Sequence, residues 1–102
     1  MTDLMAGLED VKVKTTEALR AAQADSGASV VLLAVVREFD GKADKSNAQS
    51  NSDAAIRDSV IELEQAGDSA KAAAEADTGL GEPAKEAVLA AHLAICILKT
   101  KL

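Results

Sequence analysis

The sequence predicts an all-α fold, a bundle of four or five short helices formed by a single domain over residues 1–102. Hydrophobic residues make up 48% of the chain, yet Phe39 is its only aromatic residue. The core must therefore consist mainly of Ala, Val, Leu and Ile, and such an Ala-rich composition favours packed helices over sheets. In addition, apolar residues recur in several segments at the alternating spacing of three and four that an amphipathic helix requires.

The first helix is expected to begin at a cap, Thr2 or Asp3, and to end at about Ala24. Polar residues occupy most of the positions between its apolar ones, so one face of this helix is expected to be buried. The residues of that face are Leu4, Leu8, Val11, Thr15, Ala18 and Ala22.

The segment "SVVLLAVVREFDG", residues 29–41, suits either a buried strand or a buried helix, because periodicity does not distinguish the two in a continuous apolar run. Ser26 and Ser29 are suitable N-caps, and Gly41 is a suitable terminator. The chain has no second run of this kind, so a strand here would leave its backbone hydrogen bonds unsatisfied. We therefore expect a helix over residues 30–39.

Residues 40–52 are polar and show no apolar periodicity, which predicts a flexible surface loop. A calcium-binding loop is the alternative for this segment. Asp40, Asp44 and Asn47 do not fall at the alternating ligand positions of such a loop, and no Glu is placed to close the site. The segment is therefore interpreted as a loop without a metal.

The third helix is expected to open at Ser50 or Ser52, followed by Asp53. Its apolar face continues through residue 74, and Gly67-Asp68 predicts a bend or a restart in the middle. The residues of this face are Ile56, Val60, Leu63, Gly67, Ala70 and Ala74.

Residues 76–83, "ADTGLGEP", predict a turn, and Pro83 suits the first position of the last helix. That helix is expected to run to the C-terminus, where Lys99 and Lys101 suit the negative end of its dipole. Because it is apolar almost all round, we expect it to be central in the bundle.

His92 and Cys96 are the only histidine and the only cysteine of the chain. They are four residues apart, so they lie on one face of a helix. A zinc site needs four ligands, and Glu86 lies on a different face. A nucleophilic Cys96 would need a base that a third group orients, and the sequence indicates no such group. The pair is interpreted as packing at the edge of the core. We therefore expect no catalytic, metal-binding or cofactor-binding residues in this protein, and no cofactor.

Carboxylates are the other candidate site. Asp58 and Glu62 share a helix face, with Glu64 beside them, and an acidic solvated face accounts for all three. A di-metal helical bundle would need Glu-x-x-His, which does not occur, and no phosphate loop, nucleotide fingerprint, zincin motif or esterase elbow is present. The sequence therefore indicates a protein that is not an enzyme, and a small enzyme using Cys96 stays as an alternative.

Two segments, "ALRAAQADSGASVVLLAVVREF" (18–39) and "RDSVIELEQAGDSAKAAAE" (57–75), carry a resemblance to a known family. The matching features include Arg57-Asp58-Ser59, Ala66-Gly67 and Glu75, and the whole resembles the GatB/YqeY family, the tail domain of the aspartyl/glutamyl-tRNA amidotransferase B subunit and its free-standing relatives. The resemblance implies an all-helical accessory domain linked to tRNA-dependent amidation, without catalysis of its own. Most of the family's basic residues are missing, which weakens any expectation of tRNA contact.

The net charge is −6, and the three arginines, Arg20, Arg37 and Arg57, are widely separated. Nucleic-acid binding needs a clustered basic face, so it is disfavoured.

The apolar stretches fall far short of the roughly 20 residues of a membrane span, and no secretory signal is visible, so we expect a cytoplasmic protein without membrane contact. The favoured function is a non-catalytic protein–protein interaction or regulatory module, with self-association as a homodimer through the apolar last helix.

Overall fold

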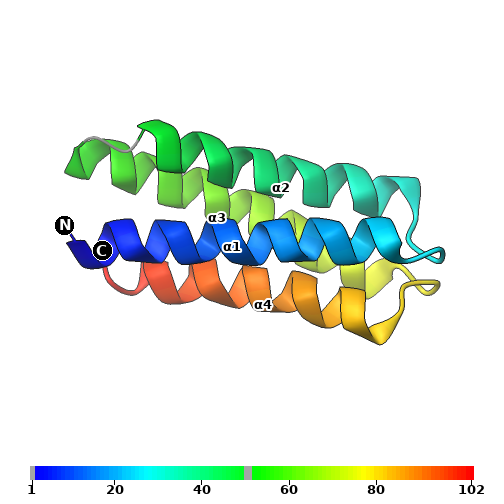
Figure 1. Cartoon of the computed structure of the whole chain (residues 1–102). Coiled ribbons are helices and arrows are strands. Elements are labelled where there is room, and N and C mark those ends of the chain that lie inside the picture. Colours follow the sequence, from blue (N-terminus) through cyan, green and yellow to red (C-terminus); the bar gives the residue numbers. More distant parts are fainter. Residues whose placement is uncertain (1, 50–51) are drawn as a thin grey trace.

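The computed structural model describes residues 2–49 and 52–102, which form a four-helix bundle (Figure 1). The all-α prediction is confirmed, and the ambiguous run over residues 30–39 is helical. The helices are α1 (Thr2–Ala24), α2 (Val30–Gln49), α3 (Asp53–Ala76) and α4 (Glu82–Lys99).

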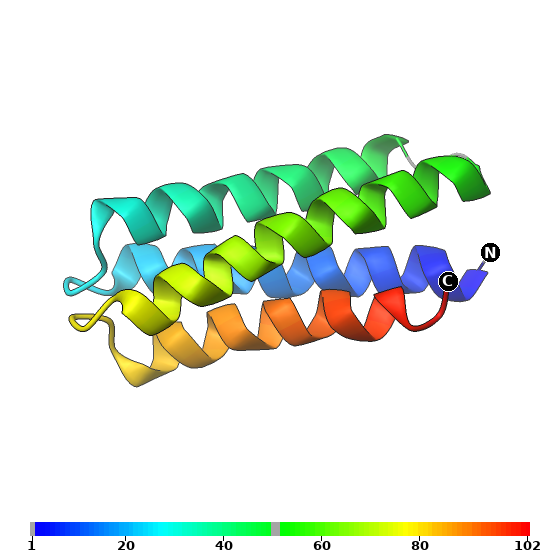
Figure 2. The same cartoon turned by 180° about the vertical axis from the view of Figure 1, so that it is seen from behind.

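Each helix runs antiparallel to the next, and the four close into a ring (Figures 1 and 2). α1 packs on α2 and α4, and α3 packs on the same two helices. The start of α1, the C-terminus, the end of α2 and the start of α3 lie at one end of the bundle, whereas the loops after α1 and α3 lie together at the other (Figures 1 and 2). The longest dimension is 40 Å, close to the length of a 24-residue helix that rises about 1.5 Å per residue.

Every helix buries one stripe of mostly aliphatic side chains along the axis of the bundle. Phe39 is fully buried among them, and many of the others are alanines, which let the helices approach closely. Gly7 on α1 allows an even closer approach to α4, because an added Cβ there would lie 2.5 Å from Leu98 Cδ1. The buried stripes are Leu8, Val11, Thr15, Ala18 and Ala22 on α1; Leu32, Val36, Phe39, Ala43 and Ser46 on α2; Ile56, Val60, Leu63, Ala66, Gly67, Ala70 and Ala74 on α3; and Ala84, Val88, Ala91, Ile95 and Leu98 on α4.

The prediction that the last helix is central was wrong. α4 is one of four equivalent members of the ring and packs on α1 and α3. Leu93 is 58% exposed and Ile97 is 49% exposed on its outer side. Four helices of similar length each bury one stripe around a common axis, and these stripes fill the interior. No room is left inside the bundle for a helix that the others surround.

The predicted polar loop over residues 40–52 was also wrong for residues 40–49, because α2 continues through Gly41 to Gln49; residues 50 and 51 of that prediction lie outside the described residues. Its buried stripe continues as well, through Phe39, Ala43 and Ser46 at the same spacing of four and three. Ala43 and Ser46 are small or polar, so this part of the stripe does not show in the hydropathy of the sequence.

Polar side chains in this last part of α2 bond back to carbonyl oxygens one turn earlier. Ser46 Oγ donates to the oxygen of Lys42 at 2.7 Å. Asn47 Nδ2 donates to the oxygen of Ala43 at 2.9 Å. Both side chains thus find an acceptor within the helix, and no loop is required to accommodate them.

α3 is a single helix from Asp53 to Ala76, so the bend or restart predicted at Gly67-Asp68 is absent. Gly67 is buried and marks a close helix contact instead of a helix end. No helix within residues 2–49 and 52–102 has both the length and the hydropathy for crossing a bilayer.

Two of the predicted caps are confirmed. Ser29 Oγ accepts a hydrogen bond from the N–H of Leu32 at 3.1 Å, and Ser52 Oγ accepts one from Ala55 at 3.1 Å. Pro83 lies in the first turn of α4, directly after Glu82. The alternative caps at residues 2, 3 and 50 fall outside the side chains that the structure describes.

Candidate functional site

Polar side chains gather along two seams of the bundle. The α3–α4 cluster contains the histidine and the cysteine that the sequence singles out, and the α1–α2 cluster contains three of the residues considered for calcium. The α3–α4 cluster consists of Glu64, Asp68, His92, Cys96 and Lys99; the α1–α2 cluster consists of Lys12, Thr15, Thr16, Asp40, Asp44 and Asn47.

His92 forms the centre of the α3–α4 cluster. Its Nε2 lies 2.9 Å from Oδ1 of Asp68, and because a carboxylate only accepts, the ring donates this bond. The His92 side chain is 17% exposed, whereas that of Asp68 is 64% exposed. The neighbouring Gly67 keeps α3 close to α4, since an added Cβ there would lie 3.6 Å from His92 Cδ2 and 3.1 Å from Ile95 Cγ2.

The expectation that no group orients His92 was therefore wrong. Asp68 comes from another helix, 24 residues earlier in the chain, and was assigned in the sequence to a helix restart. The contact places a carboxylate, an imidazole and a thiol side by side. Asp68, His92 and Cys96 thus have the residue types of a nucleophilic triad, and their geometry decides what they can do.

The sulfur of Cys96 lies 3.7 Å from His92 Nε2 and 3.9 Å from Nδ1. A thiol that donates to one ring nitrogen lies along the lone pair of that nitrogen and well away from the other. Nearly equal distances place Sγ off both lone-pair directions. Moreover, Nε2, the nitrogen nearer to Sγ, is already bonded to Asp68, whereas in a triad the acid holds the nitrogen opposite the nucleophile. This arrangement is a packing contact and lacks triad geometry.

Lys99 extends the cluster toward the end of α4. Its Nζ lies 2.8 Å from Oε2 of Glu64. The hydrogen bond to Glu64, together with the negative charges of Glu64 and Asp68, raises the pKa of Lys99. The ammonium is therefore held in its charged form at the carboxyl end of α4, where it also complements the helix dipole. This contact ties α3 to α4 at the surface.

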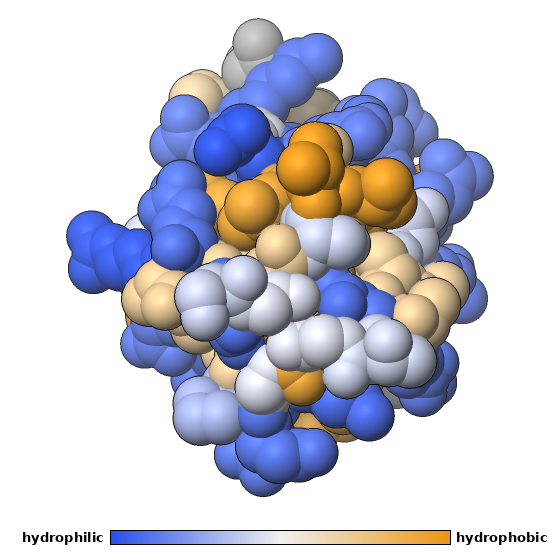
Figure 3. Space-filling model, turned by 90° about the vertical axis from the view of Figure 1, so that its right-hand side faces the viewer, coloured by the Kyte–Doolittle hydropathy of each residue, from blue (hydrophilic) through white to orange (hydrophobic). Residues whose placement is uncertain are grey.

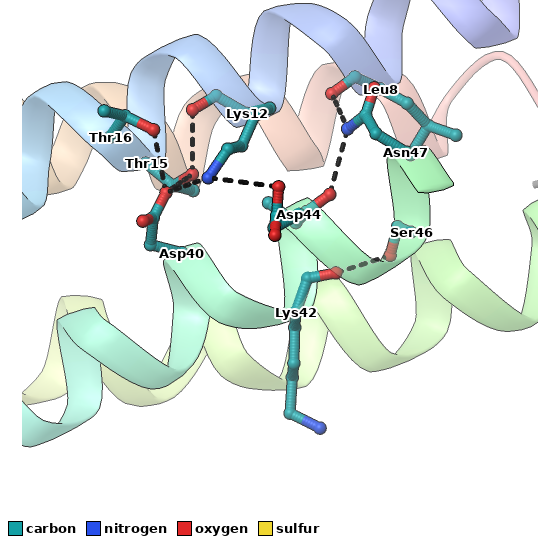
Figure 4. Close-up of polar contacts among 10 residues, drawn as sticks. Leu8, Lys12, Thr15, Thr16, Asp40, Lys42, Asp44, Ser46 and Asn47 are labelled. Carbon is teal, nitrogen blue, oxygen red and sulfur yellow. Dashed lines mark hydrogen bonds and ion pairs between the residues drawn. The ribbon is translucent and has the colours of Figure 1, made fainter. Parts of the chain in front are cut away.

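The α1–α2 cluster is centred on a single oxygen atom, Oδ1 of Asp40 (Figure 4). This atom accepts hydrogen bonds from Thr15 Oγ1 at 2.8 Å and Thr16 Oγ1 at 2.9 Å. Lys12 Nζ lies 3.0 Å from the same oxygen and 3.7 Å from Oδ1 of Asp44. Burial alone would raise the pKa of Asp40, but the hydrogen bonds from Thr15, Lys12 and Thr16, together with the Lys12 charge, outweigh burial and hold this pKa below its ordinary value.

Asn47 adds one more tie between α1 and α2. Its Nδ2 donates to the carbonyl oxygen of Leu8 at 2.9 Å (Figure 4). The three residues considered for calcium, Asp40, Asp44 and Asn47, thus lie on one face of α2 and point toward α1. They contact lysine, threonine and backbone groups, as expected for a helix seam.

The other carboxylates that the sequence analysis named lie outside both clusters. Asp58 and Glu62 are exposed on α3, and Glu86 is exposed on α4. Among the residues that the structure describes, no group of three or more His, Cys, Asp or Glu side chains is arranged to hold a metal ion.

The most connected polar group, Asp40, is not among the residues that the sequence predicts for a site, because the polar composition after it predicts a loop. A signal for it exists: Leu32, Val36, Phe39 and Ala43 keep the helical spacing past Gly41. Asp40 follows Phe39 directly, which places it beside the buried stripe at a helix seam.

Comparisons of the chain with protein-family models, with curated protein sequences and with solved structures find no match.

Proposed function

We propose that this protein is a non-catalytic helical interaction module that binds another protein through the outer face of α4. The observation that carries this proposal is the exposure of Leu93 (58%) and Ile97 (49%). These side chains are four residues apart and thus share one face of α4. The bundle has already filled its core without them, so their burial is left for a partner.

A hollow of about 300 Å³ adjoins this face, between α1 and α4 and near the chain termini. Most of its lining residues are Ala, Gly, Ile or Leu, while Asp10 and Lys101 contribute one charge of each sign. The lining residues are Ala6, Gly7, Asp10, Ala94, Ile97, Leu98 and Lys101. An apolar side chain from a partner would be received by this hollow beside Ile97.

A second copy of the chain is the partner we propose first. Pairing about a twofold axis presents the same patch on both subunits, so each patch must complement itself. Asp10 and Lys101 at the edge of the hollow allow this, since each could face its opposite in the other copy. Such local pairing offsets part of the repulsion between two chains that each carry a net charge of −6.

A second apolar patch offers a matched control. Val30 is 83% exposed and Val31 is 68% exposed at the start of α2. This start lies at the end of the bundle where the two loops meet, and the view of that end shows apolar residues gathered among polar ones (Figure 3). The start of α2 lies at the end of the bundle opposite the C-terminus (Figure 1), whereas the hollow beside Ile97 is lined by residues near the start of α1 and the end of α4.

Light scattering on the purified chain over a range of concentrations, up to the tens of micromolar, tests the proposal. We expect a mass of twice 10.5 kDa for the wild type and a monomer for Leu93→Lys/Ile97→Lys, because two buried ammonium groups would oppose the interface. The control Val30→Lys/Val31→Lys should remain dimeric. A wild-type monomer at every concentration would contradict self-association. A photo-crosslinking side chain at position 93 would then test the face for a different protein.

A further inference from the structure

The two loops at one end of the bundle, residues 25–29 and 77–81, are held by aspartates. Asp25 uses its two carboxylate oxygens differently. Oδ1 accepts from the N–H of Gly27 in its own loop, at 2.8 Å. Oδ2 accepts from the N–H of Gly81 in the other loop, at 2.7 Å.

Asp77 makes the reciprocal pair of bonds. Its Oδ1 accepts from the N–H of Gly79 in its own loop, at 3.1 Å, and its Oδ2 accepts from the N–H of Ser29 in the other loop, at 2.8 Å. The hydrogen bond from Ser29 is the largest influence that lowers the pKa of Asp77. Each loop thus supplies one carboxylate and two backbone N–H groups to a shared set of four bonds.

The backbones of the two loops also touch. A Cβ added to Gly27 would overlap the carbonyl oxygen of Gly79, and a Cβ added to Gly79 would lie 2.7 Å from the carbonyl oxygen of Gly27. No glycine in the described residues has a positive φ, so these glycines are needed for the close approach and not for an unusual conformation.

These contacts repeat with a constant shift of 52 residues. Adding 52 carries Asp25 onto Asp77 and Gly27 onto Gly79, within "ADSG" at residues 24–27 and "ADTG" at residues 76–79. The same shift carries α1 onto α3 and α2 onto α4 with boundaries that agree to about two residues.

The buried stripes repeat with the same shift. At ten pairs of positions that are 52 residues apart, both members are buried, whatever their residue types. The pairs are 8 and 60, 11 and 63, 15 and 67, 18 and 70, 22 and 74 in α1 and α3, and 32 and 84, 36 and 88, 39 and 91, 43 and 95, 46 and 98 in α2 and α4.

The polar clusters also correspond: Asp40 is equivalent to His92, and Thr16 is equivalent to Asp68. Between α1 and α2, Asp40 accepts from Thr16. Between α3 and α4, His92 donates to Asp68. A hydrogen bond is thus made at the same place in both helix pairs, with the direction of donation reversed. Independent helices would have no reason to share this place.

We propose that the chain is a duplicated α-hairpin whose two copies are joined by a reciprocal clasp, formed by Asp25 and Asp77 with the N–H groups of residues 27, 29, 79 and 81. The first copy ends and the second begins at the opposite end of the bundle, where α2 ends and α3 starts (Figure 1). The clasp therefore holds the end at which the two hairpins would otherwise separate. Hydrogen bonds to charged carboxylates suit this role, because they are stronger than bonds between neutral groups.

Amide hydrogen exchange, followed by NMR on the full-length chain, tests the clasp across the two hairpins. In Asp25→Ala we expect the amide of Gly81 to exchange at least about tenfold faster, and in Asp77→Ala that of Ser29, because each loses a bond to a charged acceptor. Each amide is far from the substitution in the sequence, so its intrinsic exchange rate is unchanged. Asp58→Ala, at an exposed position on α3, is the control and should leave both amides as they are.

Duplication adds the expectation that Asp25→Ala and Asp77→Ala lower the melting temperature by similar amounts. Should alanine prevent folding, Asp25→Asn and Asp77→Asn keep the side-chain shape and one acceptor oxygen, and the same amides are followed. Faster exchange confined to the substituted loop, with the amide across the clasp changed less than twofold, would overturn the clasp. Strongly unequal melting temperatures would overturn the equivalence of the two hairpins.

Discussion

Lys12 on α1 places its ammonium group 3.0 Å from Oδ1 of Asp40 on α2. The same oxygen also accepts from Thr15 and Thr16, and the Asp40 side chain is only 16% exposed. Three donors on α1 thus converge on one acceptor of α2. These contacts between α1 and α2 therefore depend on the ionisation of one carboxyl group, that of Asp40.

The first prediction concerns pH. The donors around Asp40 lower its pKa in the folded protein, so Asp40 contributes stability that is fully present above its unfolded pKa. This contribution is lost as the pH falls through the folded pKa. We expect the free energy of unfolding, measured by urea denaturation, to decline below about pH 5, and Asp40→Asn to show a shallower decline. The difference between the two proteins should be largest near neutral pH.

Asp44→Asn is the control for this pH series. Asp44 faces the same lysine at 3.7 Å, but its side chain is 77% exposed. Water screens such a pair, so its removal should change stability by less than about 1 kcal/mol at any pH. A decline as steep in Asp40→Asn as in the wild type would show that other carboxyls dominate acid unfolding.

The second prediction compares two helical glycines. Gly41 is exposed on α2, with no atom within 4 Å of an added Cβ, so Gly41→Ala should stabilise the protein by about 0.5–1 kcal/mol through helix propensity. At Gly67 the added Cβ would lie 3.1 Å from Ile95 Cγ2 and 3.2 Å from Phe39 Cζ. Gly67→Ala should therefore be destabilising, by about 1–3 kcal/mol of overpacking. Thermal denaturation distinguishes the two, and a stabilised Gly67→Ala would mean that α3 and α4 can move apart easily.

The third prediction concerns the contact between His92 and Asp68. Because the Asp68 side chain is 64% exposed, a double-mutant cycle with His92→Ala and Asp68→Ala should give a coupling energy of about 1 kcal/mol or less. Denaturant titrations of the four proteins supply this energy. A coupling of several kcal/mol would indicate a desolvated pair and would require a functional explanation.

The fourth prediction concerns Cys96. The thiol is partly buried and packs on the imidazole of His92, so Cys96→Ala should lower the free energy of unfolding by about 1 kcal/mol. Association of the chain, measured by light scattering, should be unaffected. Lost association at an unchanged melting temperature would contradict the interpretation of Cys96 as a packing residue.

The sequence was sufficient for the helices whose buried positions are aliphatic. α1, the first half of α2 and α4 follow from the spacing of Leu, Val and Ile. The second half of α2 was lost because Ala43 and Ser46 fill its buried positions, and neither raises the local hydropathy. Gly67 was interpreted as a helix end, although its function is to let Phe39 and Ile95 approach. A glycine that ends a helix and a glycine that permits a close contact between helices cannot be told apart in the sequence until the neighbouring helix is known.

The polar sites show a similar division. His92 and Cys96 could be paired from their spacing within one helix, but Asp68 reaches His92 only through the packing of two helices. The clasp was not predicted either, although the sequence carries a signal for it, since "ADSG" and "ADTG" recur 52 residues apart. An internal repeat of that length, two helices and a loop, puts Asp25 and Asp77 at equivalent places in two loops at one end of the bundle, where each accepts from an N–H of the other loop.

The last prediction uses the repeat to interpret the exposed valines. Val30 and Val31 start α2 at the positions where Glu82 and Pro83 start α4. A Glu in the first turn complements the helix dipole, and a Pro there removes an N–H that has no partner within the helix. Val30→Glu/Val31→Pro should therefore leave the free energy of unfolding unchanged or raise it by about 0.5 kcal/mol, while the converse Glu82→Val/Pro83→Val should lower it. Urea denaturation measures both. If the first variant is destabilised by more than about 1 kcal/mol, the valines pack within the fold and the two helix starts are not equivalent; if it is not, the valines are dispensable for folding and the two helix starts are equivalent.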